Sequence, residues 1–209
     1  EEGKTPAASG PNVMDIDFDA LIANETDSTL KDMHEYFRDR TPTEKNQYTG
    51  MFQGKNLLLF TGEAFWIGAV NEQYTPTLYK LAHSGFVFEN FYNPLWYYST
   101  VDGEYAATTG LIPTNQVNAS QRYAGKNGVS MYFSMGNQLR ALGYPTLAYH
   151  NNTANYYDRN LSHPNLGYDF YACDTGLDVA MTWPQSDLEM MQLTLPQALA
   201  GEKPFHNYY

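Results

Sequence analysis

The hydrophobic positions of this chain form short continuous runs, separated by longer segments in which apolar residues recur at helical spacing. Residues 57–60 (LLLF) are a continuous apolar run, which is typical of a strand buried on both faces. Residues 86–91 and 146–149 predict a second and a third strand, and residues 205–209 predict a fourth. Strands that alternate with helices indicate an α/β domain with a mainly parallel sheet flanked by helices.

The segments between these strands predict helices. Residues 75–85 begin with a threonine and a proline, which suit a helix start, and they end with a glycine. Apolar residues at helical spacing predict another helix over residues 131–142. Ser186 and Glu189 form a capping-box pattern at the start of a third helix, which Pro196 is expected to kink or end.

The first part of the chain has a different composition. Residues 1–12 are rich in proline, glycine, serine and alanine, and they predict a flexible leader. A short amphipathic helix is expected after Asp27, followed by a polar connector. We therefore divide the chain into residues 1–50, a leader with one helix and a connector, and residues 51–209, which carry the α/β pattern.

The charge balance narrows the classes of partner. Twelve Lys and Arg residues against 23 Asp and Glu residues give a net charge of −11. This balance argues against nucleic acid as a partner, because neutralising phosphates needs a basic surface. An acidic domain can still bind a phosphate when a cation lies between them. The single cysteine, Cys173, excludes an internal disulfide framework, and no apolar run is long enough to span a bilayer.

Residues with chemical potential follow three of the predicted strands. Ligands of parallel α/β sheets bind beyond the carboxyl ends of the strands. Glu63 follows the first strand, where its carboxylate could serve as an oxygen ligand for a hard cation. A helix-capping or solvated glutamate is the alternative interpretation of Glu63 taken alone.

Thr100 follows the second predicted strand. Ser99 and Asp102 form an N-cap pattern that places Thr100 in the first turn of a helix, where N–H groups and the helix dipole favour a phosphate. A hydroxyl at that position, also bound to a cation, could attack phosphorus. An ordinary capped helix is the alternative interpretation.

His150 ends the third predicted strand, and polar residues follow it closely. A histidine, two amides and an arginine within ten residues can hold an anionic oxygen from several sides, and these are His150, Asn151, Asn152 and Arg159. A lone histidine and an Arg–Asp pair are also common structural features. The other histidines belong to no predicted site: His34, His83, His163 and His206.

Taken in order, these segments resemble the extracellular catalytic domain of the lipoteichoic acid synthase family, within the sulfatase and alkaline phosphatase superfamily. The resemblance runs from about residue 18 to residue 209, and residues 54–65, 75–92, 99–105 and 143–169 carry it. It identifies residues 51–209 as the N-terminal part of a sulfatase-like catalytic domain.

The resemblance implies roles for individual residues. Glu63 and Thr100 would bind the metal, and Thr100 would also be the nucleophile. His150 and Arg159 would hold the phosphoglycerol group, with Tyr157 and Asn152 as further substrate-binding residues. The chain departs from the family pattern at residues 96–98 (WYY), where glycines are usual, and at Tyr157, where tryptophan is usual.

The implied reaction is a two-step transfer that depends on Mn²⁺ or Mg²⁺. Thr100 would take phosphoglycerol from phosphatidylglycerol and pass it to a glycerol hydroxyl of a glycolipid or growing polymer. The family's domain lies at the outer face of the cytoplasmic membrane, and its transmembrane helices are not in this chain. Three alternatives stay open: another sulfatase-superfamily hydrolase, a phosphoethanolamine transferase, and an inactive module of the same fold that binds headgroups or glycans.

The family also has residues that this sequence does not contain. Beyond the strand at residues 205–209 it continues to a substrate-binding histidine and to an Asp–His pair that completes the metal site. Glu63 and Thr100 alone supply too few ligands for a tightly held divalent ion. The remaining half is therefore expected further along the protein or as a separate chain.

We expect the 209 residues by themselves to have no phosphodiesterase activity, because half of the metal site is missing. The measurement is hydrolysis of a phosphodiester by this chain alone in the presence of Mn²⁺ or Mg²⁺. Measurable turnover would contradict the prediction.

Overall fold

The computed structural model describes residues 9–92, 99–112, 131–201 and 204–209, and it divides into two compact units, Glu1–Lys55 and Asn56–Tyr209. Part of the expected leader (residues 1–8) and the departure at residues 96–98 lie outside the described residues. None of the described helices combines the length and apolar character needed to cross a membrane.

The first unit contains two helices, α1 (Phe18–Asn24) and α2 (Ser28–Arg38), which contact each other. The helix predicted after Asp27 is confirmed as α2, and the Asp27 side chain accepts hydrogen bonds from the backbone of Thr29 and Leu30. Asp17 caps α1 in the same way by accepting from Ala20, and no pattern in the sequence had predicted α1. Aspartate is among the preferred N-cap residues because its carboxylate satisfies N–H groups that the helix leaves open.

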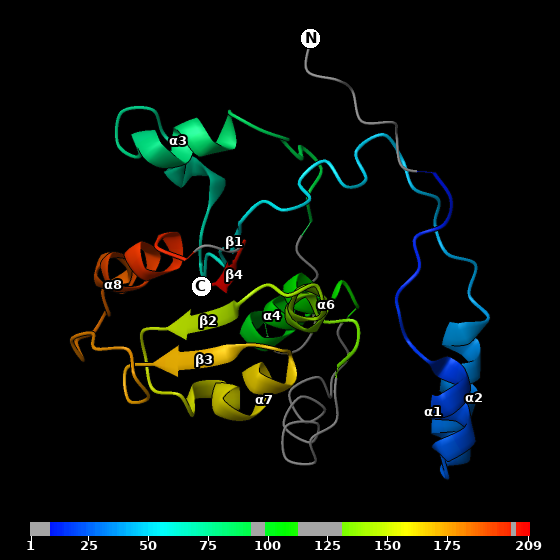
Figure 1. Cartoon of the computed structure of the whole chain (residues 1–209). Helices are drawn as coiled ribbons and strands as arrows, with labels where there is room; N and C mark the ends of the chain where they lie inside the picture. The colour runs from blue at the N-terminus through cyan, green and yellow to red at the C-terminus, as the bar shows by residue number, and fades with distance from the viewer. Residues whose placement is uncertain (1–8, 93–98, 113–130, 202–203) are drawn as a thin grey trace. The chain divides into compact units, whose positions relative to one another are not determined.

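The second unit is built on a four-stranded parallel sheet with the strand order β1-β4-β2-β3 (Figure 1). The strands are β1 (Leu57–Leu59), β2 (Thr146–His150), β3 (Asp169–Ala172) and β4 (His206–Tyr208). The strand nearest the C-terminus therefore lies inside the sheet, between β1 and β2. The predicted α/β class with a parallel sheet is confirmed.

This unit also contains several described helices and turns. They are η1 (Ile67–Ala69), α3 (Pro76–Ala82), α4 (Ser99–Thr109), α6 (Met135–Ala141), η2 (Tyr156–Asp158), α7 (Arg159–Asn165) and α8 (Asp187–Leu199). Helix α6 contacts β2, α7 contacts β3, and α7 and α8 lie on different sides of the sheet in Figure 1.

Side chains that alternate along the strands supply two cores, one on each face of the sheet. One core gathers Ala148 and Tyr208 with residues at the end of α7. The other gathers Tyr149 with Met190 of α8, and Tyr209 packs against it. Strand β2 therefore contributes to both cores, and β4 contributes Tyr208 to the first, with Tyr209 following directly after the strand.

One predicted strand is wrong, and one prediction about a helix holds only in part. Residues 86–91 form no strand, and their aromatic rings are exposed, with Phe88 at 74% and Phe91 at 77%. Among the described residues no strand lies beside this segment to pair with it, and β propensity is expressed only on a surface that packs. Of the two effects expected of Pro196, an end of the helix is contradicted, since α8 continues to Leu199, and a kink stays a prediction. Packing of α8 on the sheet, including a 2.9 Å hydrogen bond between Thr194 Oγ1 and Tyr209 OH, stabilises the helix around the proline.

The start of α8 is partly as predicted. The Ser186 side chain accepts a hydrogen bond from the Glu189 backbone N–H, so Ser186 is the N-cap. The Glu189 carboxylate does not complete the capping box, because it accepts from the Ala180 backbone N–H at 3.0 Å. Helix α6 is shorter than predicted and begins after Ser134, whose hydroxyl also donates to the Leu166 carbonyl at 2.8 Å.

Gly167 occupies a position that only glycine fits. Its φ is +91°, and a Cβ atom there would overlap the backbone nitrogen of Asn137 at the start of α6. The Gly167 carbonyl also accepts a hydrogen bond from the Thr146 hydroxyl of β2, at 2.5 Å. The residue therefore joins α6, β2 and the turn after α7.

We expect Gly167→Ala to lower the free energy of unfolding by at least about 2 kcal/mol, because the substitution adds both backbone strain and a steric overlap. The measurement is urea denaturation followed by circular dichroism. Gly103→Ala is the matched control, because nothing lies within 4 Å of its Cβ position in the interior of α4. That control should leave stability unchanged or raise it by up to about 1 kcal/mol. Equal stabilities of the two variants would contradict the prediction.

Candidate active site

A pocket of about 230 Å³ opens where the strands reach their carboxyl ends. All of its lining residues belong to the unit Asn56–Tyr209. They are Thr61, Glu63, Thr100, Glu104, Tyr149, His150, Tyr156, Tyr157, Arg159, His163, Tyr208 and Tyr209. Five of the six predicted site residues are in this list, and they come from segments up to 96 positions apart, from Glu63 to Arg159 (159 − 63 = 96).

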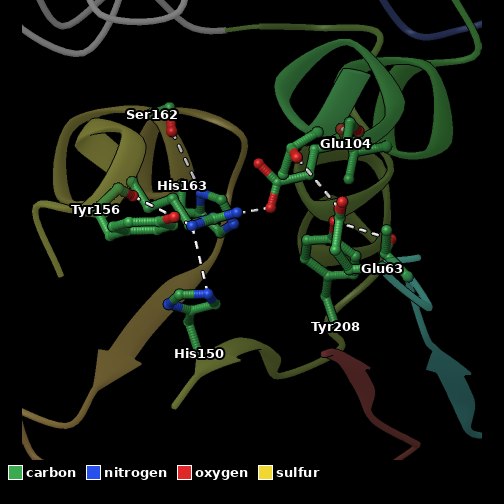
Figure 2. Close-up of polar contacts among 11 residues, drawn as sticks. Glu63, Glu104, His150, Tyr156, Ser162, His163 and Tyr208 are labelled. Carbon is green, nitrogen blue, oxygen red and sulfur yellow. Dashed lines mark hydrogen bonds and ion pairs between the residues drawn. The ribbon is translucent and has the colours of Figure 1, made fainter. Parts of the chain in front are cut away.

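Glu63 and Thr100 meet at one wall of the pocket. Thr100 Oγ1 donates a hydrogen bond to Glu63 Oε2 at 3.2 Å (Figure 2). Thr100 is the second residue of α4, so it lies in the first helical turn as predicted. Glu63 lies a few residues beyond β1, and Thr61 between them is fixed by a 3.0 Å hydrogen bond to the Tyr208 hydroxyl. Two oxygen atoms that could serve as metal ligands, from separate elements, are thus in contact.

Arg159 and Glu104 form a buried ion pair beside them. Arg159 Nε donates to Glu104 Oε1 at 2.8 Å, and the two residues are only 4% and 8% exposed. Burial raises the pKa of Glu104, and the Arg159 charge opposes that shift. Arg159 Nη1 donates to the Tyr156 carbonyl at 3.2 Å and approaches His150 Nε2 at 3.4 Å.

His150 is neutral in this environment. Burial, aided by the positive charge of Arg159, lowers the pKa of His150 to about 4. With Nε2 facing the Arg159 N–H, the proton of the neutral ring belongs on Nδ1, which is buried and has no hydrogen-bond partner among the described residues. The ring stacks on Tyr156 with its centroid 5.9 Å away (Figure 2).

Tyr157 lies in a strained turn at the mouth of the pocket. Tyr157 and Asp158 have φ values of 58° and 54°, in the left-handed region that residues other than glycine seldom occupy. The Tyr157 ring is 41% exposed, contacts the Tyr156 ring edge-on at 4.6 Å, and lies 5.3 Å from the Arg159 guanidinium carbon. Backbone strain of this kind is concentrated at functional sites.

Asn152 is the one predicted site residue that does not line the pocket. Its side-chain oxygen accepts from the Thr153 backbone N–H at 2.7 Å, and its carbonyl accepts from the Cys173 N–H at 3.1 Å. The neighbouring Asn151 donates to Asp187 at 2.9 Å. Both amides therefore hold the loop after β2, and a substrate role for Asn152 stays a prediction.

The pocket residues that the sequence did not predict include Glu104 and His163. His163 is buried, its Nδ1 lies 3.2 Å from the Ser162 hydroxyl, and burial lowers its pKa to about 3. A signal was available in both cases. Glu104 follows Thr100 by four positions and His163 follows Arg159 by four, so each shares a helix face with a predicted site residue.

The described residues fit part of a divalent-metal site. Glu63 and Thr100 provide two hard oxygen ligands 3.2 Å apart. Among the residues that the structure describes, no three or more His, Cys, Asp or Glu side chains are grouped as metal ligands. Since Mg²⁺ and Mn²⁺ take about six ligands, the pocket offers a portion of the coordination shell and leaves the rest to other groups.

The chain belongs to the sulfatase family, whose profile matches residues 55–205. Among curated proteins it is similar to lipoteichoic acid synthase 2 of Bacillus subtilis (strain 168), with 25% identity over 212 residues that cover 94% of this chain and 31% of that protein. Among solved structures it is similar to the lipoteichoic acid synthase LtaP from Listeria monocytogenes, with a TM-score of 0.64 and 24% identity over 76% of this chain and 40% of that one. The predicted resemblance is confirmed, and the chain spans less than half the length of either relative.

The two neutral histidines predict how stability depends on pH. Because the pKa values of His150 and His163 are lowered to about 4 and about 3, the unfolded chain binds protons below about pH 6.5 while the folded chain does not. Stability should therefore be full above pH 6.5 and fall as the pH drops toward 4, by roughly 2 kcal/mol or more. The raised pKa of Glu104 offsets part of this loss.

The measurement is the free energy of unfolding of the chain, and of its His150→Asn variant, between pH 7.5 and 4.5. The variant should lose part of the pH dependence, because it removes one of the three histidines whose pKa is lowered by burial, His150, His163 and His206. His83→Asn is the control, since His83 is exposed and lies outside the pocket. A wild-type stability that does not change over this range would contradict the prediction.

Proposed function

We propose that this chain supplies the nucleophile and the anion-binding side of a metal-dependent phosphoglycerol transferase of the lipoteichoic acid synthase type. The observation that carries the proposal is the 3.2 Å hydrogen bond between Thr100 Oγ1 and Glu63 Oε2, in a pocket that Arg159 also lines. A hydroxyl, a carboxylate and a guanidinium around one cavity suit phosphoryl transfer, which depends on positioning and charge stabilisation.

In the first step Thr100 attacks the phosphorus of a phosphatidylglycerol-type donor. The new bond joins Thr100 Oγ1 to phosphorus, the bond from phosphorus to the diacylglycerol oxygen breaks, and that oxygen leaves with a proton. A bound Mn²⁺ or Mg²⁺ held by Glu63 and Thr100 would lower the pKa of the threonine hydroxyl. Glu63 already accepts the hydrogen bond of that hydroxyl, so it orients the oxygen that attacks.

In the second step a glycerol hydroxyl of the acceptor attacks the phosphorus and displaces Thr100, whose oxygen recovers a proton. Arg159 stabilises the charge on the phosphoryl oxygens in both steps, and the start of α4 adds N–H groups close to Thr100. Neutral His150 and the exposed Tyr157 ring line the pocket where the glycerol part of the donor would lie.

The proposed function also implies where the domain would work. The donor is a membrane lipid, so the domain would work at the outer face of the cytoplasmic membrane, where glycolipid or polymer acceptors are present. The remaining metal ligands and a further substrate-binding residue would come from a region equivalent to the part of the relatives that this chain does not match. Water as the acceptor in place of a glycerol hydroxyl would make the same site a hydrolase.

We expect Thr100→Ala in the complete protein to lower phosphoglycerol transfer by at least about 10³-fold, because it removes the group to which phosphorus is bonded. Mass spectrometry of the protein after exposure to phosphatidylglycerol should detect a glycerophosphate adduct on Thr100 in the wild type and none in the variant. Thr109→Ala is the matched control, because Thr109 lies on the same helix and its hydroxyl donates to the Tyr105 carbonyl. A Thr100→Ala variant with wild-type transfer would exclude the proposed nucleophile.

A further inference from the structure

Glu104 is the least expected member of the pocket, because a second carboxylate close to Glu63 opposes the binding of an anion. The two carboxylates interact, and the charge of Glu63 adds to the effect of burial in raising the pKa of Glu104. A buried glutamate in an anion site costs free energy unless its contacts compensate for the charge. The contacts of Glu104 therefore have to account for its presence.

The main contact of Glu104 is with one particular edge of Arg159. Glu104 Oε1 accepts a hydrogen bond from Arg159 Nε–H at 2.8 Å. Arg159 Nη1 is directed to the Tyr156 carbonyl at 3.2 Å and to His150 Nε2 at 3.4 Å. A guanidinium has five N–H donors in a fixed planar fork. These contacts use Nε and Nη1 and leave Nη2, which has no hydrogen-bond partner among the described residues, as the donor group for an anion.

Glu104 also ties this arrangement to the nucleophile. It follows Thr100 by four residues in α4, so the two side chains share one face of the same helix. Arg159 is the first residue of a different helix, α7. One rigid helix thus carries both the hydroxyl that attacks and the carboxylate that fixes the arginine.

We propose that Glu104 is a positioning residue that holds the Arg159 guanidinium by its Nε edge, so that Nη2 is presented to the phosphoryl group attacked by Thr100. This role rests on the proposed function for the identity of the anion, but the anion site itself is defined by the Glu104–Arg159 pair. Glu104 acts through Arg159 and does not contact the reacting atoms.

Two conservative variants separate position from charge. Glu104→Asp keeps the negative charge but is shorter by one methylene, about 1.5 Å, so its oxygen no longer reaches Nε without moving the arginine. Glu104→Gln keeps the length and an oxygen that accepts from Nε, but it removes the charge. Neither variant leaves Arg159 facing an apolar side chain, so both are expected to fold.

The measurement is the affinity for inorganic phosphate by isothermal titration in the presence of Mg²⁺, with the protein's thermal midpoint recorded for each variant. We expect Glu104→Asp to bind phosphate about tenfold more weakly, the order of one charge-assisted hydrogen bond. Glu104→Gln should bind within about threefold of the wild type or more tightly, since a repelling charge is gone. Asp169→Asn is the control, because it breaks an exposed ion pair with Arg140 outside the pocket.

Each other outcome overturns the proposal. Weak binding by Glu104→Gln with normal binding by Glu104→Asp would show that the charge matters and the position does not. Normal binding by both would leave Glu104 a purely structural residue, and no phosphate binding by the wild type would remove the anion site. Because the assay needs no transfer reaction, the expected binding pattern together with a lack of transferase activity in the complete protein would overturn the proposed function alone.

Discussion

The site depends on the insertion of β4 between β1 and β2. Leu57 pairs with His206 on one side, and Thr146 pairs with the same residue on the other. This strand therefore joins two segments that are about ninety positions apart in the sequence, and it places the loop with Glu63 beside the end of β2 with His150. Tyr208 extends the connection, because its hydroxyl reaches Thr61 beyond β1 at 3.0 Å. Parallel strands bring all their carboxyl ends to one edge, so one strand is enough to assemble the pocket from distant parts of the chain.

The electrostatics of the pocket follow from burial at this edge. Its lining includes two carboxylates, Glu63 and Glu104, and one guanidinium, while lowered pKa values keep His150 and His163 neutral. The formal charge of these groups is therefore −1, which is unfavourable for a phosphodiester. A divalent cation beside Glu63 would reverse that sign and make the pocket attractive to an anion. The charges of the lining residues thus support the proposed requirement for a metal.

The sequence predicted which residues lie together at the pocket better than it predicted the elements around it. The pocket positions of Glu63 and His150 could be predicted because ligands bind beyond the carboxyl ends of parallel strands. The rule does not account for Thr100, since the strand predicted before it, residues 86–91, does not form; the helix-start pattern at residue 99 is what indicated Thr100. Whether residues 86–91 form a strand depends on a neighbouring strand with which to pair, and the hydrophobic pattern of one segment does not show such a neighbour. A site role for Glu104 or His163 is not evident from either residue alone; it becomes evident only from their helical spacing to Thr100 and Arg159. Asn152 was included because it is near His150 in the sequence, but the loop geometry turns its amide toward its own backbone.

The strained turn at Tyr157 contacts the guanidinium of Arg159, the group that we propose to bind an anion. Two consecutive left-handed residues cost roughly 1 kcal/mol or more each, and the turn persists because flanking contacts over-determine it. The Asp158 N–H reaches the Asn155 carbonyl at 2.8 Å, and Arg159 Nη1 reaches the Tyr156 carbonyl at 3.2 Å. The guanidinium that would bind the phosphoryl group therefore also stabilises the turn that contains Tyr157. Glu104 of α4 binds the same guanidinium. The helix that carries Thr100, the guanidinium and the exposed Tyr157 ring are therefore connected by contacts, and a shift of one of them should disturb the others.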